Sequence, residues 1–212
     1  YLSWNVNKNL NLGLFENVMW VPGDINFTYL NPIIFAHPVD EANGSPGKSL
    51  VGFTGSYKFL NHYVFYGQFA INEFTFNEVF SGKGYWANKQ GGQLGIKYFD
   101  AFNISKLNLQ AELNSVRPYT YSAQDEIKNY GHLNQSLAHP FGANFRELIS
   151  IGSYSYKRFR FREQASYSLY GQDAPGTDYG KNIYLTYNNR QSDYGHHIGQ
   201  GITTHLYFSD FN

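Results

Sequence analysis

The sequence predicts an all-β fold, an antiparallel transmembrane β-barrel to which this chain contributes about nine or ten strands. Apolar and polar residues alternate along many segments, and the connections between these segments are short and long in turn. Charged residues are only 15% of the 212 residues, whereas aromatic residues are 19%. Soluble domains average about 25% charged residues, so this composition indicates a surface that meets lipid or a ligand.

Strict two-residue alternation is clearest over residues 107–114. Every second residue there is apolar: Leu107, Leu109, Ala111 and Leu113. Such a strand has one apolar and one polar face. The same period occurs over 51–59 and 158–169, and further strands are predicted at about 10–20, 62–73, 91–101, 144–156 and 199–211, with 1–6 as the tail of another. This makes nine strands; the facing of 144–156 stays open, because Leu148 and Tyr154 are out of phase with Ile149 and Ile151.

The connections fall into two classes. The short ones are 7–9, 60–61, 102–105 and 157–158, and the long ones are about 21–48, 74–90, 118–143 and 172–198. Outer-membrane barrels have short periplasmic turns and longer extracellular loops, so we expect the long connections to lie outside the cell. Aromatic residues near the strand ends fit interfacial girdles: Trp4, Trp20, Tyr63, Phe74, Tyr98 and Phe99.

These features predict that residues 1–212 are a single region of a barrel integral to the bacterial outer membrane. The chain has no apolar run of the roughly 20 residues that a spanning helix needs, and its mean hydropathy is −0.46. Barrel strands bury only alternate residues in lipid, so a low hydropathy is compatible with this fold. Because nine is odd and bacterial single-chain barrels have an even number of strands, we expect the barrel to be incomplete.

The composition and motifs argue against several functions. The absence of cysteine excludes disulfides and thiolate metal sites. The 16 basic and 16 acidic residues balance, with no basic run, so no nucleic-acid partner is expected. Known catalytic motifs are absent, and the acidic pairs Asp40-Glu41 and Asp125-Glu126 are better explained as solvated loop residues. We therefore expect no enzymatic activity and no cofactor.

Histidine and arginine groups leave alternatives open. His132 and His139 share one long loop, and His196 and His197 share another. A metal site between these loops is one interpretation, but structural hydrogen bonding is favoured and no metal site is predicted. Arg158, Arg160 and Arg162 form a column on the polar side of one strand. Pairing with Glu112, Glu147 or similar carboxylates in the lumen is favoured over a basic track for an anionic polymer.

The long loops combine residues suited to sugars. Aromatic rings stack on the C–H faces of a sugar, and amides, carboxylates and guanidinium groups pair with its hydroxyls. Packing of the same residues against the barrel rim is the equal alternative. The candidate polysaccharide-binding residues are Tyr85, Trp86, Asn88, Lys89, Arg117, Tyr119, Tyr121, His132, Asn134, His139, Tyr187 and Arg190.

Residues 129–145, with the sequence NYGHLNQSLAHPFGANF, resemble the Wzi-type capsule-assembly family of outer-membrane proteins. Shorter similar stretches are 84–89, 97–100, 116–121 and 194–201. The resemblance implies a larger monomeric barrel whose extracellular side binds surface or capsular polysaccharide, as a lectin rather than an enzyme. Some relatives resemble gliding-motility components. No sugar-contact motif of the family maps onto this chain, so the candidate site above depends on loop chemistry.

Two other functions remain as alternatives. The chain could be a structural subunit of an outer-membrane secretion or gliding-motility complex, with membrane-protein partners besides the outer-membrane lipid. It could also be a passive porin. Tyr66 and Tyr207 are expected to point into the lumen beside the arginine column, which predicts a low conductance.

Overall fold

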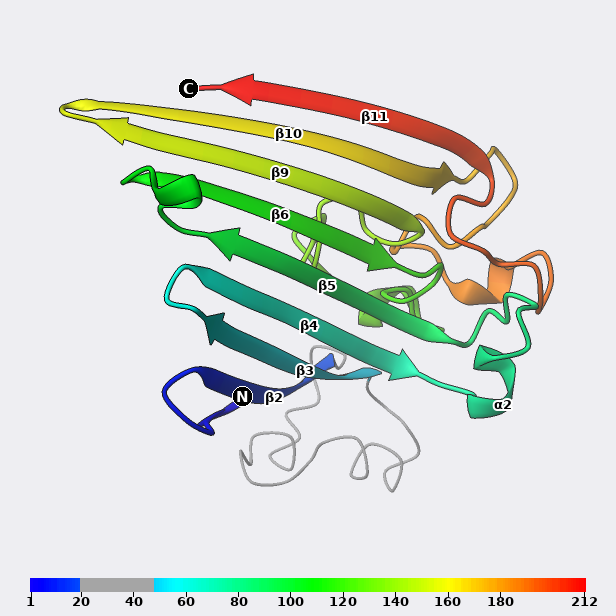
Figure 1. Ribbon diagram of the computed structural model, residues 1–212. Coiled ribbons are helices and arrows are strands. Elements are labelled where there is room, and N and C mark those ends of the chain that lie inside the picture. The colour runs from blue at the N-terminus through cyan, green and yellow to red at the C-terminus, as the bar shows by residue number, and fades with distance from the viewer. Residues whose placement is uncertain (20–47) are drawn as a thin grey trace.

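The computed structural model describes residues 1–19 and 48–212, which form one nine-stranded antiparallel sheet (Figure 1). Each strand pairs with the next one along the chain, apart from a small hairpin, β7–β8, inserted between β6 and β9. The strands of the sheet are β1 (Leu2–Asn5), β2 (Leu10–Met19), β3 (Lys48–Phe59), β4 (Tyr63–Glu73), β5 (Lys89–Tyr98), β6 (Leu107–Val116), β9 (Phe145–Tyr156), β10 (Phe159–Gln172) and β11 (Ile202–Phe211). The prediction of nine antiparallel strands is confirmed. The predicted loop 21–48 and the girdle residue Trp20 fall almost wholly outside the described residues.

The described residues do not close the sheet into a barrel. β1 pairs only with β2, and β11 pairs only with β10, so these two strands form the edges of the sheet. Figure 1 shows them at opposite sides, in blue and red. The described residues therefore show an open antiparallel sheet and no closed barrel.

The strand register gathers apolar residues on one face, which we call the apolar face. Directly paired residues of an antiparallel sheet point to the same side. One row of such pairs crosses all nine strands: Trp4, Leu12, Gly55, Gly67, Leu94, Leu113, Leu148, Tyr167 and Tyr207. Large side chains in this row are open to the surroundings, as Leu94 is 68% and Leu148 52% exposed. The opposite side, here the polar face, carries Gln68, Gln93, Asn114 and Glu147.

The register decides the facing of β9, which the sequence left open, and tests the expected facing of two tyrosines. Leu148 pairs with Leu113, so β9 presents Leu148 on the apolar face and Ile149 on the polar face. Tyr66 lies on the polar face, as expected, where its hydroxyl donates to Glu112 over 2.5 Å. The expectation for Tyr207 is wrong, because Tyr207 pairs with Tyr167 on the apolar face.

The predicted rhythm of short and long connections is confirmed for the described residues. Tight turns need backbone in the left-handed region, and Leu60 (φ 46°), Asn61 (φ 59°) and Lys157 (φ 53°) supply it between β3 and β4 and between β9 and β10. The turn between β5 and β6 contains the 3₁₀ helix η2 (Ala101–Asn103). These turns all lie at one end of the sheet (Figure 1).

The long connections form a layer at the other end of the sheet, here called the loop layer and made of residues 74–88, 117–144 and 173–201. It contains the helix α2 (Phe76–Val79), the 3₁₀ helices η3 (Glu126–Lys128) and η4 (Tyr187–Asn189), and the hairpin β7 (Gly131–His132) to β8 (Gln135–Ser136). In the described residues, no helix has the length and apolarity needed to cross a membrane.

The hydrophobic core lies between the loop layer and the polar face. Leu50, Val116 and Phe145 come from strands, and they pack with Tyr121, Ala143 and Ile183 from loops. All six are at most 5% exposed. Figure 1 accordingly shows green loop segments behind β5 and β6. The loops therefore cover the part of the polar face near the long connections, whereas the large side chains of the apolar row stay exposed.

Candidate functional site

The loop candidates meet around one indole ring, and we call this group the Trp86 cluster. The Arg190 guanidinium lies 4.0 Å from the Trp86 ring centroid, and the Lys89 ammonium lies 4.5 Å from it. The rings of Tyr187 and Tyr119 are 4.8 and 6.4 Å away. The structure thus brings together candidates from all three described long loops. Cation–π contacts of this kind stabilise packed loops without any ligand.

Lys89 is enclosed at the centre of the cluster. Lys89 is 0% exposed, and its ammonium forms an ion pair with the Glu73 carboxylate at 2.9 Å. The same ammonium lies 3.7 Å from the Tyr187 ring centroid. A buried charge must be paired to be tolerated, so Glu73 and the two aromatic rings account for Lys89.

Arg117 connects this cluster to two loops through backbone carbonyls. Its Nε donates to Asn88 over 2.8 Å, and its Nη2 donates to Tyr85 over 3.1 Å and to His196 over 3.2 Å. Burial lowers the pKa of Arg117 from its usual value. A guanidinium stays charged in proteins, and its carbonyl partners carry no net charge. The positive charge of Arg117 is therefore not neutralised by the groups to which it donates.

Tyr119 and His196 are also held inside the loop layer. The Tyr119 hydroxyl donates to the Asp178 carbonyl over 2.7 Å and lies 3.3 Å from His196 Nδ1. The His196 Nε2 lies 2.7 Å from the Ser192 carbonyl, which can only accept, so Nε2 carries the proton and Nδ1 is free to accept. Burial lowers the pKa of His196 and raises that of Tyr119, which keeps both groups neutral.

The candidates differ in what they can offer a ligand. Four of them are at most 5% exposed and have their polar atoms or rings inside the layer: Asn88, Lys89, Tyr119 and Tyr121. Tyr85, Trp86, Tyr187 and Arg190 are half-buried, and His132 and Asn134 are exposed. Packing therefore explains the first four, and the exposed and half-buried candidates are the ones that can reach a polysaccharide.

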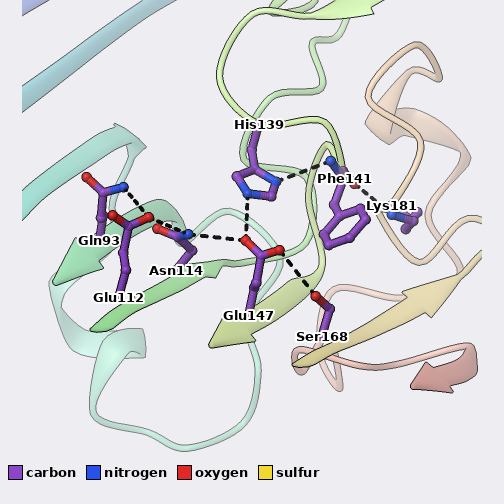
Figure 2. A network of polar contacts seen from close by, with 8 residues as sticks. All are labelled: Gln93, Glu112, Asn114, His139, Phe141, Glu147, Ser168 and Lys181. Carbon is purple, nitrogen blue, oxygen red and sulfur yellow. Dashed lines mark hydrogen bonds and ion pairs between the residues drawn. The ribbon is translucent and has the colours of Figure 1, made fainter. Parts of the chain in front are cut away.

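A second group of polar residues lies on the polar face beneath the loop layer (Figure 2). Glu147 Oε2 is 3.0 Å from His139 Nε2 and 3.2 Å from Asn114 Nδ2, and Glu147 Oε1 accepts from Ser168 Oγ over 3.3 Å. Asn114 continues the network to Glu112 Oε1 over 3.0 Å. A cavity of about 280 Å³ adjoins this network, lined in part by Asn114 and His139.

His139 fixes its loop to the sheet through this network. Its Nδ1 accepts from the Phe141 backbone N–H over 3.2 Å, so the proton of the neutral ring is on Nε2 and is donated to Glu147. Burial lowers the pKa of His139, which favours this neutral form. The described residues contain no group of three or more histidine and acidic side chains that could hold a metal ion.

The favoured interpretation of the arginine column is wrong for the described residues. Glu147 pairs across β9 and β10 with Ser168, whereas Arg162 pairs with Ser153 and donates to Gln164 over 3.0 Å. Six residues of β10 separate Arg162 from Ser168, or about 20 Å at roughly 3.3 Å per residue. The arginines are exposed near the short turns, too far from either glutamate for an ion pair. A basic track remains a prediction.

A surface pocket of about 540 Å³ lies between the β7–β8 hairpin and residues 181–184. Its wall combines amide, ammonium and aromatic side chains: Asn134, Gln135, Phe141, Lys181, Asn182 and Tyr184. Two buried hydroxyls of the lining residues Ser136 and Tyr184 have no hydrogen-bond partner in the described part of the chain. Asn134 is the only sequence candidate in this pocket. Lys181 and Asn182 were missed because they carry no periodic or motif signal.

The segment that carries the family resemblance has a structural role. Asn144 has φ 58°, and its side-chain amide donates to the carbonyls of Tyr179 (3.1 Å) and Gln200 (2.9 Å). Its side-chain oxygen accepts from the Gly199 N–H over 2.7 Å. The segment therefore joins the last long loop to the start of β9.

Comparison of the whole chain with protein-family models, curated proteins and solved structures gave no match.

Proposed function

We propose that this chain is part of an integral outer-membrane β-barrel that binds surface or capsular polysaccharide through its extracellular loops, as a non-enzymatic attachment protein. The observation that carries the membrane part is the exposed apolar row across all nine strands, from Trp4 to Tyr207. Water-soluble monomers rarely expose contiguous apolar patches beyond a few hundred Å². Contact with lipid would be favourable for these apolar side chains, whereas contact with water is not.

A barrel is proposed because an open sheet would be unstable in lipid. Within residues 1–19 and 48–212, the edge strands β1 and β11 have unpaired backbone groups along one side, and each such group costs several kcal/mol in hydrocarbon. Further strands that join β1 to β11 would remove both edges. In such a barrel the apolar face meets lipid, the polar face lines the lumen, and the loop layer covers its extracellular mouth.

The surface pocket between Asn134 and Tyr184 supports the polysaccharide part of the proposal. Its volume of about 540 Å³ falls within the range of small-ligand pockets. Phe141 and Tyr184 offer rings for stacking on a sugar, while Asn134, Gln135 and Asn182 offer amides for its hydroxyls. The half-buried Trp86 and Arg190 could extend the contact along a polymer.

An array of bacterial capsular and exopolysaccharides, probed with the purified full-length protein in detergent, tests this proposal. We expect binding to at least one glycan, weakened about tenfold or more in a triple variant Asn134→Ala, Gln135→Ala, Asn182→Ala. The exposed loop residue Gln191 provides the matched control Gln191→Ala, which should bind as the wild type does. Absence of glycan binding, or full binding by the triple variant, would refute the proposed site.

A structural subunit of a larger membrane complex is the second candidate, favoured by apolar side chains at the tips of the loop layer. Leu133 at the β7–β8 turn is 84% exposed, and Phe80 after α2 is 79% exposed. Exposed apolar residues at such positions suit contact with a partner protein. Co-purification of a stable partner in detergent, without glycan binding, would favour this second function.

A further inference from the structure

A groove of about 440 Å³ opens on the apolar face where β4, β5, β6 and β9 approach the loop layer. Phe69, Leu94 and Leu113 form its apolar part. Gly92 leaves it hollow, because Gly92 pairs with Phe69 on one side and Ser115 on the other and has no side chain. A Cβ at Gly92 would lie 3.4 Å from the nearest Phe69 atom, which is ordinary contact, so a side chain could extend from there into the groove.

Two guanidinium groups line the same groove at its loop end. Arg146 lies on the apolar face opposite Ser115 and is exposed, and its side chain has no hydrogen bond or ion pair with any described residue. Arg117, two residues after Ser115, is bound only to backbone carbonyls through its Nε and Nη2. The described residues that line the groove include no aspartate or glutamate. This end of the groove therefore has an uncompensated positive charge.

The order of these groups matches one kind of ligand. The charged end is next to the loops, and the apolar part extends towards the middle of the sheet. Guanidinium groups bind phosphate through two parallel hydrogen bonds, and an acyl chain would fit beside leucine and phenylalanine. A molecule with phosphate at one end and hydrocarbon at the other would satisfy both parts.

We propose that this groove binds a membrane lipid, with its phosphate headgroup on Arg146 and Arg117 and the upper part of one acyl chain against Phe69, Leu94 and Leu113. The inference rests on the proposed membrane location and goes beyond the polysaccharide function. The lipid would belong to the outer leaflet, because the groove is at the loop end of the strands.

Native mass spectrometry of the full-length protein in detergent, titrated with phosphatidylglycerol, tests the site. We expect one tightly retained lipid in the wild type and about tenfold weaker retention in Arg146→Gln. Gly92→Leu should weaken retention similarly by filling the groove while leaving both arginines in place. Arg160→Gln, which removes an exposed arginine from the polar face at the other end of the sheet, is the matched control and should retain the lipid.

Two further arms identify the ligand. Diacylglycerol, which lacks phosphate, should be retained poorly, and excess inorganic phosphate should not displace phosphatidylglycerol. Unchanged retention in both groove variants, or displacement by inorganic phosphate, would overturn the lipid site. Failure of the protein to float with phosphatidylglycerol vesicles would instead refute the membrane location itself, so the two failures are distinguishable.

Discussion

At the scale of single residues, the loop layer contains an acid whose surroundings oppose its charge. Asp178 is 3% exposed. Its Oδ1 accepts from the Gly180 N–H over 2.8 Å, but its Oδ2 has no partner among the described residues. Burial raises the pKa of Asp178 to about 6, from 3.8 in the unfolded chain. A raised pKa means that folding favours the protonated acid.

The sign of the pH dependence follows from this shift. The contribution of Asp178 to stability is fully present below pH 3.8 and is lost as the pH rises through about 6. We predict that Asp178→Asn will gain stability relative to the wild type between pH 4 and pH 7, by at most about 3 kcal/mol. Unfolding midpoints of the two proteins at several pH values measure this difference.

The comparison of the two proteins removes other titrating groups from the result. His139 and His196 have lowered pKa values, so their contributions are lost as the pH falls, opposite to Asp178. Both histidines are present in the wild type and in the variant. A difference between the proteins that does not change with pH would contradict the prediction.

Burial of individual loop residues could not be predicted from the sequence. The chemistry of Trp86, Lys89 and Arg190 predicted that these residues take part in recognition or loop packing, and they do gather in one place. Whether a side chain faces a ligand depends on partners from distant parts of the chain, such as Glu73 for Lys89. No local pattern encodes such partners.

At the scale of elements, alternation was sufficient to locate strands but not always to orient them. β6 has a clean apolar side, and the register confirms it. β11 is mixed: Tyr207 and Phe211 lie on the apolar face, yet Leu206 and Phe208 lie on the other. An edge strand with apolar residues on both sides gives no clear period, which explains the error for Tyr207. The predicted ion pairs of the arginine column are absent from the described residues for a different reason. Alternation placed the arginines on the same face as Glu112 and Glu147, but it does not show how far along the strands they lie from these glutamates.

The apolar face leads to a prediction that two adjacent residues of β9 can test. Leu148 is 52% exposed on the apolar face, whereas Ile149 points to the polar face opposite Glu112. Leu148→Arg should reduce folding stability in lipid bilayers by about 2–4 kcal/mol, as charges do at the middle of a barrel's lipid face. Ile149→Arg should cost less, because Glu112 can pair with the new charge.

Folding into phosphatidylcholine vesicles, followed by urea titration, measures both variants. In water an exposed leucine such as Leu148 would accept arginine with a change of only about 0.5 kcal/mol. A large loss confined to Leu148→Arg would therefore support lipid contact. Equal losses for the two variants, or no loss for Leu148→Arg, would contradict a lipid-facing apolar row.

At the scale of the whole molecule, the order of the strands followed from the sequence, but the path of the long loops did not. Short turns force neighbouring strands to pair, so the succession from β1 to β11 could be expected. The loops fold back over the polar face through contacts without sequence periodicity, such as Asn144 with Gly199. The resulting core of Val116, Phe145 and Ile183 could be found only in the structure.

This arrangement predicts a low conductance if the sheet is part of a barrel. The polar face would line the lumen, where the loop layer contacts it through His139–Glu147, while Asn144 holds two of the long loops together through its bonds to Tyr179 and Gln200. We expect the full-length protein to show small or no unitary conductance in planar bilayers. The double variant His139→Ala, Asn144→Ala should open the lumen more often, because it removes one bond between a loop and the sheet and the bonds that hold two loops together.

His132→Ala is the matched control, since His132 is an exposed histidine of the same loop as His139. Its conductance should equal that of the wild type. An open channel in the wild type would show that the loops do not block the lumen and would support a passive porin. Unchanged conductance in a folded double variant would show instead that other contacts, such as the core around Phe145, hold the loop layer in place.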